Sequence, residues 1–120
     1  MEVSIILPWP PSVNSLWRSS SKGWYMTKKA KEYKELVRYA VYKAKSPKFG
    51  DGEQIAVGVV AYPPDNRKRD LDNIFKILGD SLQDAGVYQN DCQIKKIYME
   101  MKPKADVGAV HVKIWSLPSL

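Results

Sequence analysis

The segment "DLDNIFKILGDSLQDAG", residues 70–86, has the residue pattern of an amphipathic helix. Its apolar residues recur at steps of three and four, which is the period of one helix face. Asp70 stands where an N-cap residue is favoured, and Gly86 occupies the C′ position that glycine usually takes. We expect the apolar face to pack against the core through five residues: Leu71, Ile74, Phe75, Leu78 and Leu82.

Strand-like and helix-like segments alternate on both sides of this helix. A second helix is predicted over residues 27–45, with Thr27 as its N-cap and a strongly basic face opposite the apolar one. Its apolar face comprises Tyr33, Leu36, Val37, Ala40, Val41 and Ala44. Four strands are predicted, at residues 2–7, 54–62, 92–101 and 108–117.

The connections complete the predicted architecture. Residues 8–25, "PWPPSVNSLWRSSSKGWY", are predicted to be an irregular loop, because prolines, serines and glycine interrupt any periodic pattern. The last two strands carry alternating apolar residues around the turn 102–107, so we expect them to form a half-buried antiparallel hairpin. The order β-α-β-α-β-β predicts a single α+β (mixed α/β) domain over residues 1–120. Its mixed β-sheet would have about four strands, packed with two main helices.

Composition limits the partners and cofactors. The chain has 44% apolar residues, as globular proteins do, and a net charge of +6 with a pI near 9.4. This charge favours a polyanionic partner, either nucleic acid or an anionic membrane surface. The single cysteine, Cys92, excludes an internal disulfide framework, fits a reducing compartment and is expected to be partly buried. Because His111 is the only histidine, a zinc site of the usual kind is excluded.

The first residues carry no pattern of export or membrane insertion. The apolar run within "MEVSIILPWPP", residues 1–11, is broken by prolines and is too short for a signal peptide or a membrane span. We therefore expect a soluble, cytoplasmic protein with no membrane partner.

Opposite charges are concentrated in "NRKRDLDNIFK", residues 66–76. As the N-cap, Asp70 is not yet helical, so its carboxylate can turn over the first turn toward Asp72. Asp72 and Lys76 are four residues apart and share the accessible face of the helix. The helix start therefore presents two carboxylates, the amide of Asn73 and an ammonium group. On spacing alone, these groups either cap and stabilise the helix or act on a charged substrate.

A third acid and three cations fit the second alternative. Asp91 lies in the loop after the helix, where aspartate is also an ordinary turn residue. Mg²⁺ prefers hard oxygen ligands and is held by a few carboxylates together with substrate phosphate. Arg67, Lys68 and Arg69 suit contacts to a phosphate backbone. Acids and cations side by side make chemical sense if a metal bridges the three acids to the phosphate.

Four features of the sequence coincide with one known pattern. They are the run "RKRDLDN", a lysine four residues after its second aspartate, "ND" nineteen residues after that aspartate, and the opening "LPWPPSVNSLWR". With these features the chain resembles, essentially from end to end, the RusA family of Holliday junction resolvases. These are phage-associated endonucleases that cut four-way DNA junctions. The stretch between the two predicted helices is less similar.

The resemblance implies a Mg²⁺-dependent endodeoxyribonuclease, with Mn²⁺ as a substitute metal, that acts in DNA recombination and repair. It would resolve four-way branched DNA by paired symmetric nicks, as a homodimer with two active sites and no small-molecule cofactor. A bacterial or phage-encoded protein is expected. The implied metal-binding and catalytic acids are Asp70, Asp72 and Asp91, with Lys76 as a further catalytic residue. The expected DNA-binding residues are Arg67, Lys68, Arg69 and Asn73.

In the expected mechanism, one or both subunits contribute the acids that bind the metal. The metal lowers the pKa of a bound water and stabilises charge on the phosphoryl oxygens. Lys76 neutralises the transition state or orients the water. Cations of the first helix extend the basic surface: Lys28, Lys29 and Lys31.

Two questions stay open at the level of the sequence. Trp9, Trp17 and Trp24 either stack on unpaired bases at an opened crossover or pack the loop onto the core or a partner subunit. The alternatives to a resolvase are a non-catalytic basic DNA-binding module and a metal-dependent nuclease acting on flaps or RNA. The two alternatives differ in whether a metal is needed at all.

Overall fold

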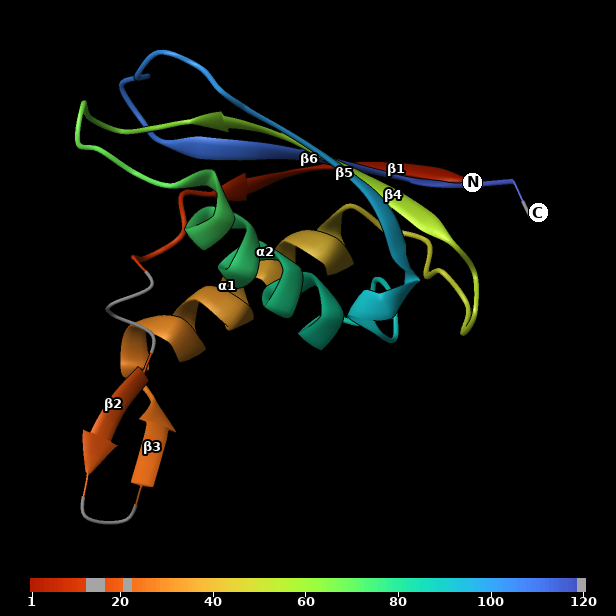
Figure 1. Cartoon of the computed structure of the whole chain (residues 1–120), viewed down its shortest axis with the longest axis horizontal. Helices are drawn as coiled ribbons and strands as arrows, with labels where there is room; N and C mark the ends of the chain where they lie inside the picture. Colours follow the sequence, from red (N-terminus) through yellow and green to blue (C-terminus); the bar gives the residue numbers. More distant parts are fainter. Residues whose placement is uncertain (13–16, 21–22, 119–120) are drawn as a thin grey trace.

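The computed structural model describes the backbone of residues 1–12, 17–20 and 23–118, and the side chains of 1–12 and 26–118. Two helices lie on one face of a four-stranded mixed sheet (Figure 1). The helices are α1 (Lys28–Lys43) and α2 (Leu71–Asp84). The strands of this sheet are β1 (Glu2–Pro8), β4 (Ile55–Tyr62), β5 (Ile94–Met101) and β6 (Ala109–Ser116). The predicted α+β fold class is confirmed.

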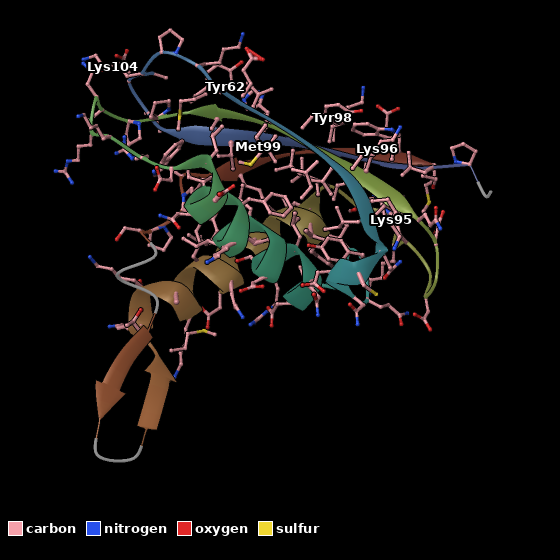
Figure 2. The ribbon with its side chains drawn as sticks, viewed as in Figure 1. Tyr62, Lys95, Lys96, Tyr98, Met99 and Lys104 are labelled. Atoms are coloured by element: carbon pink, nitrogen blue, oxygen red, sulfur yellow. The ribbon has the colours of Figure 1, made fainter. Side chains whose placement is uncertain are left out.

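The strands of the sheet have the order β1-β6-β4-β5. β6 is antiparallel to β1 and β4, whereas β4 and β5 are parallel and are connected through α2. Because β4 lies between β5 and β6, the predicted hairpin of the last two strands is wrong. Alternation alone does not identify a strand's partner, but the buried β4 suits a central position and the exposed β5 suits an edge. Figure 2 shows Lys95, Lys96 and Tyr98 along β5.

The predicted irregular loop at residues 8–25 is partly wrong. Within it, β2 (Trp17–Ser20) and β3 (Gly23–Met26) pair antiparallel, with Trp17 opposite Met26. The prolines that disfavour a strand all lie before residue 12, whereas both paired segments carry aromatic residues of high strand propensity. This small hairpin projects from the body of the protein beside the start of α1 (Figure 1).

The core fills the space between the sheet and the two helices. Most strand residues on the covered face are β-branched or leucine, including Ile5, Leu7, Val57, Val59, Val112 and Ile114. From α1, Tyr33, Val37 and Val41 are buried as predicted. Leu36 is 52% exposed and Ala44 is the exposed C-cap, so their predicted places in the core are wrong. The buried face of α1 is narrower than the apolar pattern indicated.

α2 follows the prediction closely. Ile74, Leu78 and Leu82 are buried, and Ile77 joins them although it was not in the predicted set. The helix ends at Asp84, and Gly86 has a φ of +80°, which confirms its predicted C′ role. The helix starts beyond the C-terminal end of β4 and runs back beneath the sheet (Figure 1). Its N-terminus therefore lies at one end of the sheet.

Candidate functional site

The start of α2 carries two of the predicted acids. Asp70 is the N-cap by position, with φ −95° and ψ 132°, and its backbone oxygen accepts the N–H of Ile74 at 3.3 Å. Its side chain makes no capping hydrogen bond. Asp72 lies exposed in the first turn. Neither carboxylate is committed to the helix, and both lie at the positive end of its dipole.

Asp72 and Lys76 lie on the exposed face of α2, as predicted. None of the ion pairs found among the described side chains joins them. The interpretation of these two residues as a structural i,i+4 salt bridge is therefore not supported by the geometry. Both groups remain available to a charged substrate.

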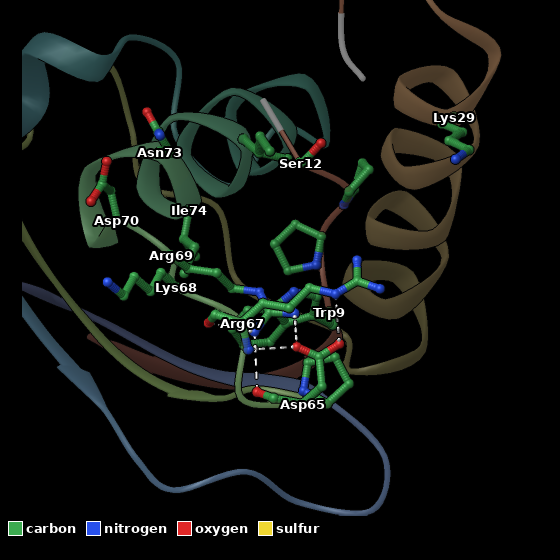
Figure 3. A pocket seen from close by; sticks show the side chains of 14 residues that line it. Trp9, Ser12, Lys29, Asp65, Arg67, Lys68, Arg69, Asp70, Asn73 and Ile74 are labelled. Carbon is green, nitrogen blue, oxygen red and sulfur yellow. Dashed lines mark hydrogen bonds and ion pairs between the residues drawn. The ribbon is translucent and has the colours of Figure 1, made fainter. Parts of the chain in front are cut away.

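A pocket of about 1130 Å³ adjoins this helix start (Figure 3). Three parts of the chain line it: the proline-rich segment after β1, the first turn of α1, and the loop from β4 into α2 together with the first turns of α2. Its lining includes the cations Lys29, Arg67, Lys68 and Arg69, together with Asp65, Asp70 and Asn73. The pocket thus places a mostly cationic wall directly beside one of the candidate metal-binding acids.

The three consecutive cations have different surroundings. Arg67 is 83% exposed, and Lys68 is exposed as well. The Arg69 side chain is only 18% exposed, and its Nη2 donates to Oδ1 of Asp65 at 2.7 Å. Its Nη1 also donates to the carbonyls of Asp65 and Arg67, at 3.2 and 3.3 Å. The hydrogen bonds of Arg69 thus stabilise the conformation of the loop, whereas the side chains of Arg67 and Lys68 extend from the loop into solvent.

Trp9 packs at the side of this loop. It is partly buried against the hydrophobic core, and the guanidinium carbon of Arg69 lies 5.1 Å from its ring centroid. Of the two uses left open for this residue, the structure shows packing. The side chains of Trp17 and Trp24 lie outside the described residues.

The structure does not bring Asp91 to the other two acids. β4 and β5 are parallel and begin together, with Ile55 paired to Ile94. Asp91 lies in the short helix η2 (Asp91–Gln93) before the start of β5, and Asp70 follows the end of β4, so the two acids lie at opposite ends of the sheet. α2, which is about 21 Å long, runs between these two ends. Within the part of the chain that the structure describes, no group of three or more His, Cys, Asp or Glu residues could hold a metal.

The segment that carries Asp91 is held by a buried amide. Gln93 is 4% exposed, and its Oε1 accepts the N–H groups of Gln89 and Asn90 at 2.9 and 3.0 Å. Its Nε2 donates to the carbonyls of Gly50 and Glu53 at 2.8 and 2.9 Å. Gln93 was not predicted from the sequence. A glutamine three positions after an asparagine is the pattern of a capping box, which the structure contains.

Other expected features have mixed outcomes. Lys28 and Lys31 are exposed on α1, while Lys29 lines the pocket, so the basic surface does extend onto this helix. Cys92 is exposed, so its predicted partial burial is wrong. Neither α1 nor α2, the long helices of the described chain, has the length and apolarity to cross a membrane.

Comparison with known proteins identifies the class. A family model described as endodeoxyribonuclease RusA matches residues 8–115. The crossover junction endodeoxyribonuclease rusA of Enterobacteria phage HK97 is 35% identical over 99% of this chain and 98% of that protein. RusA of Escherichia coli strain K12 is 29% identical over 92% of each chain, and rusA of Enterobacteria phage 82 is 28% identical over 92% and 91%.

The chain therefore belongs to the endodeoxyribonuclease RusA family, and the family resemblance seen in its motifs is confirmed. It is a hydrolase that cleaves phosphodiester bonds of DNA. Membership in this family implies a divalent metal and a branched DNA substrate. The pocket beside Asp70, with its cations, is the part of the described structure that suits such a substrate.

Proposed function

We propose that this protein resolves four-way DNA junctions by paired, symmetric hydrolysis of phosphodiester bonds, with Mg²⁺ as cofactor and Mn²⁺ able to replace it. One observation carries the proposal: the Asp70 carboxylate makes no capping hydrogen bond to α2 and lies beside a pocket lined by Lys29, Arg67 and Lys68. The similar phage and bacterial proteins are named crossover junction endodeoxyribonucleases, which supports the substrate. Their sources also support action in the cytoplasm of a bacterium.

The acids at the start of α2 fit a hard divalent cation. Mg²⁺ is commonly held by one or two carboxylates, several waters and substrate phosphate, and Asp70 and Asp72 supply two solvent-facing carboxylates. When bound, the metal supplies a water of lowered pKa and neutralises charge on the phosphoryl oxygens. The third acid, Asp91, comes from the second subunit of a homodimer, because its own chain holds it at the far end of the sheet.

The basic residues have separate tasks in this proposal. Lys29, Arg67 and Lys68 bind phosphates that flank the scissile bond, since they line the pocket and two of them extend into solvent from the loop. Asn73 lines the same pocket and donates its amide to the DNA backbone. Lys76, one turn after Asp72 and unpaired with it, places its ammonium group near the charge that develops on the phosphate.

Two-fold symmetry follows from the shared site. If each site uses Asp70 and Asp72 of one chain and Asp91 of its partner, two chains form two equivalent sites. A four-way junction has approximate two-fold symmetry, so the two sites meet equivalent strands. Paired nicks in strands of like polarity are then the expected product.

The substrate is tested with end-labelled four-way junction, linear duplex, flap and RNA, each with and without Mg²⁺. Symmetric incision of the junction alone supports the proposal. Metal-independent binding without nicking would instead indicate a DNA-binding module, and cleavage of flaps or RNA a different nuclease. Asp70→Asn is expected to bind the junction and leave it uncut. Residual Mg²⁺-dependent nicking by this variant would contradict the role of Asp70.

The shared site is tested by mixing two inactive variants, Asp70→Asn and Asp91→Asn. In a mixed dimer with shared sites, one site receives both substitutions and the other receives none. Mixing is therefore expected to restore single nicks but not paired resolution. If each chain held its three acids together, both sites of the mixed dimer would be defective and no nicking would appear.

A further inference from the structure

Asp65 organises the loop that leads into α2. Its Oδ1 accepts the backbone N–H of Arg67 at 3.0 Å and the Nη2–H of Arg69 at 2.7 Å. Its Oδ2 lies 3.6 Å from Nε of Arg67. One carboxylate thus contacts both the backbone and two guanidinium groups of the basic run. Figure 3 shows these contacts at the side of the pocket.

Through Arg69, this loop is joined to a segment far away in the sequence. The Arg69 guanidinium lies over the ring of Trp9, in the proline-rich segment that follows β1. The residue before Trp9 is Pro8, whose carbonyl accepts the O–H of Tyr33 in α1 at 2.8 Å. A continuous series of contacts therefore runs from α1 through Trp9 and Arg69 to Asp65. These contacts join the three parts of the chain that line the pocket.

The same loop determines where the Asp70 carboxylate lies. Asp70 follows Arg69 directly. It is the last residue before α2, which begins at Leu71, and its backbone is still extended. A capping hydrogen bond would fix the Asp70 side chain to the helix, but none is present in the described structure. The course of residues 65–69, together with the Ile74 N–H that binds the Asp70 backbone oxygen, therefore places this acid.

Asp65 does not have the surroundings of a catalytic acid or base. The backbone N–H of Arg67, and then the Arg69 side chain, hold the pKa of Asp65 below its usual range. The carboxylate is thus ionised at neutral pH, and both of its oxygens face arginine groups. Its contacts are those of a group that holds a loop in place.

We propose that Asp65 is a positioning residue for the metal site: by holding Arg69 against Trp9, it sets the course of the basic loop and the place of the Asp70 carboxylate. This inference rests on the proposed function, because it assigns Asp70 to the metal. It adds a fourth acid that acts on the site without binding the metal.

The test compares Asp65→Asn with Asp106→Asn. Asp106 is an exposed acid in the connection between β5 and β6, so both variants remove one negative charge from the chain. Asparagine keeps an oxygen for the N–H of Arg67 but loses the charge that holds Arg69. The affinity for Mn²⁺ without DNA, measured by electron paramagnetic resonance, is expected to fall about tenfold in Asp65→Asn, as for other residues that orient metal ligands. Asp106→Asn is expected to match the unsubstituted protein.

A second readout uses the reaction. The Mg²⁺ concentration for half-maximal junction nicking is expected to rise about tenfold in Asp65→Asn and to stay unchanged in Asp106→Asn. Equal Mn²⁺ affinity in the two variants would overturn the inference. If the unsubstituted protein nicks no junction, the proposed function fails, and the Mn²⁺ measurement still decides the role of Asp65.

Asp65→Glu separates position from charge. Glutamate keeps the charge but moves the carboxylate by one methylene, so its Mn²⁺ affinity is expected to lie between those of Asp65→Asn and the unsubstituted protein. An effect of charge alone predicts full affinity for the Glu variant, which would contradict positioning. If Asp65→Asn does not fold, the same comparison is made with Asp65→Glu against Asp106→Glu, and equal affinities would again overturn the inference.

Discussion

The loop before α2, residues 63–70, and the segment after it, residues 87–93, both present acids of the proposed site, but different interactions hold them. In the first, the charged groups of Asp65 and Arg69 meet at 2.7 Å with the carboxylate partly in solvent. In the second, the neutral amide of Gln93 is almost fully buried and makes four hydrogen bonds to backbone groups.

This difference has a physical consequence for each acid. A partly exposed ion pair contributes little to global stability and weakens with salt and with acid. A buried amide whose oxygen and N–H groups all make hydrogen bonds is costly to remove, and its hydrogen bonds are insensitive to salt and to acid. We therefore expect the position of Asp70 to respond to solution conditions, and the position of Asp91 to be fixed with the fold.

The largest expected effect is from Gln93→Leu. The change removes the Gln93 partner of two N–H groups and of the Glu53 carbonyl, and one of the two donors to the Gly50 carbonyl. It should lower the free energy of unfolding by about 3 kcal/mol. Urea denaturation followed by circular dichroism measures this change. Junction nicking should fall as well, because the segment that presents Asp91 loses its attachment to Gly50 and Glu53.

Gln83→Leu is the matched control, because Gln83 is exposed on α2. The same substitution there should change the free energy of unfolding by less than about 0.5 kcal/mol. Equal stabilities of the two variants would show that the buried amide does not hold the segment 87–93.

Tyr88→Phe tests the same segment with a smaller change. The Tyr88 ring is fully buried, and its O–H donates to the carbonyl of Gly79 in α2 at 2.6 Å. Removal of the hydroxyl should lower the free energy of unfolding by about 1–2 kcal/mol, with nicking largely kept. Tyr42→Phe, at an exposed tyrosine of α1, is the control and should be neutral. A Tyr88→Phe protein as stable as this control would contradict the role of the hydroxyl.

The smallest expected effect concerns acid and the loop 63–70. The folded-state pKa of Asp65 is lowered by the Arg67 N–H and the Arg69 side chain, so its contribution to stability is complete above the unfolded pKa of about 4. That contribution is lost as pH falls through the lower folded-state value. The stability difference between the unsubstituted protein and Asp65→Asn should therefore shrink as pH falls below about 4. Urea denaturation over a pH series measures it, and a difference that stays constant would contradict the ion pair.

Much of the fold was predictable because local periodicity carries it. The helix at residues 70–86 was predicted with its N-cap and C′ residues, since capping preferences and apolar spacing are properties of adjacent residues. The pairing of β5 with β4 was not predicted, because strand pairing depends on residues far away in the sequence. The pairing of Trp17 with Met26 was also not predicted. The proline and serine content of this region suggested a loop, although its aromatic residues favour strands.

The sequence predicted only part of how the residues of the candidate site are arranged. Its acids and cations were named from motifs, and Asp70 and Asn73 do lie beside the cationic pocket. Asp65 was not among the predicted site residues, because its contacts with Arg67 and Arg69 depend on the course of the folded loop. The separation of Asp91 from Asp70 depends on the parallel pairing of β4 and β5, which a local pattern does not reveal. Metal and DNA contacts of individual residues remain predictions.

The pairing of β1 with β6 has a consequence for how the protein assembles. Glu2 lies opposite Trp115, so the two strands that meet come from nearly opposite ends of the chain. Closing so long a loop is slow relative to forming β4, α2 and β5, which are close in sequence. Trp9 directly follows β1, and it supports the wall of the pocket. During synthesis, β1 has no partner strand until β6 has been made, so the pocket beside Asp70 is completed only at the end of folding.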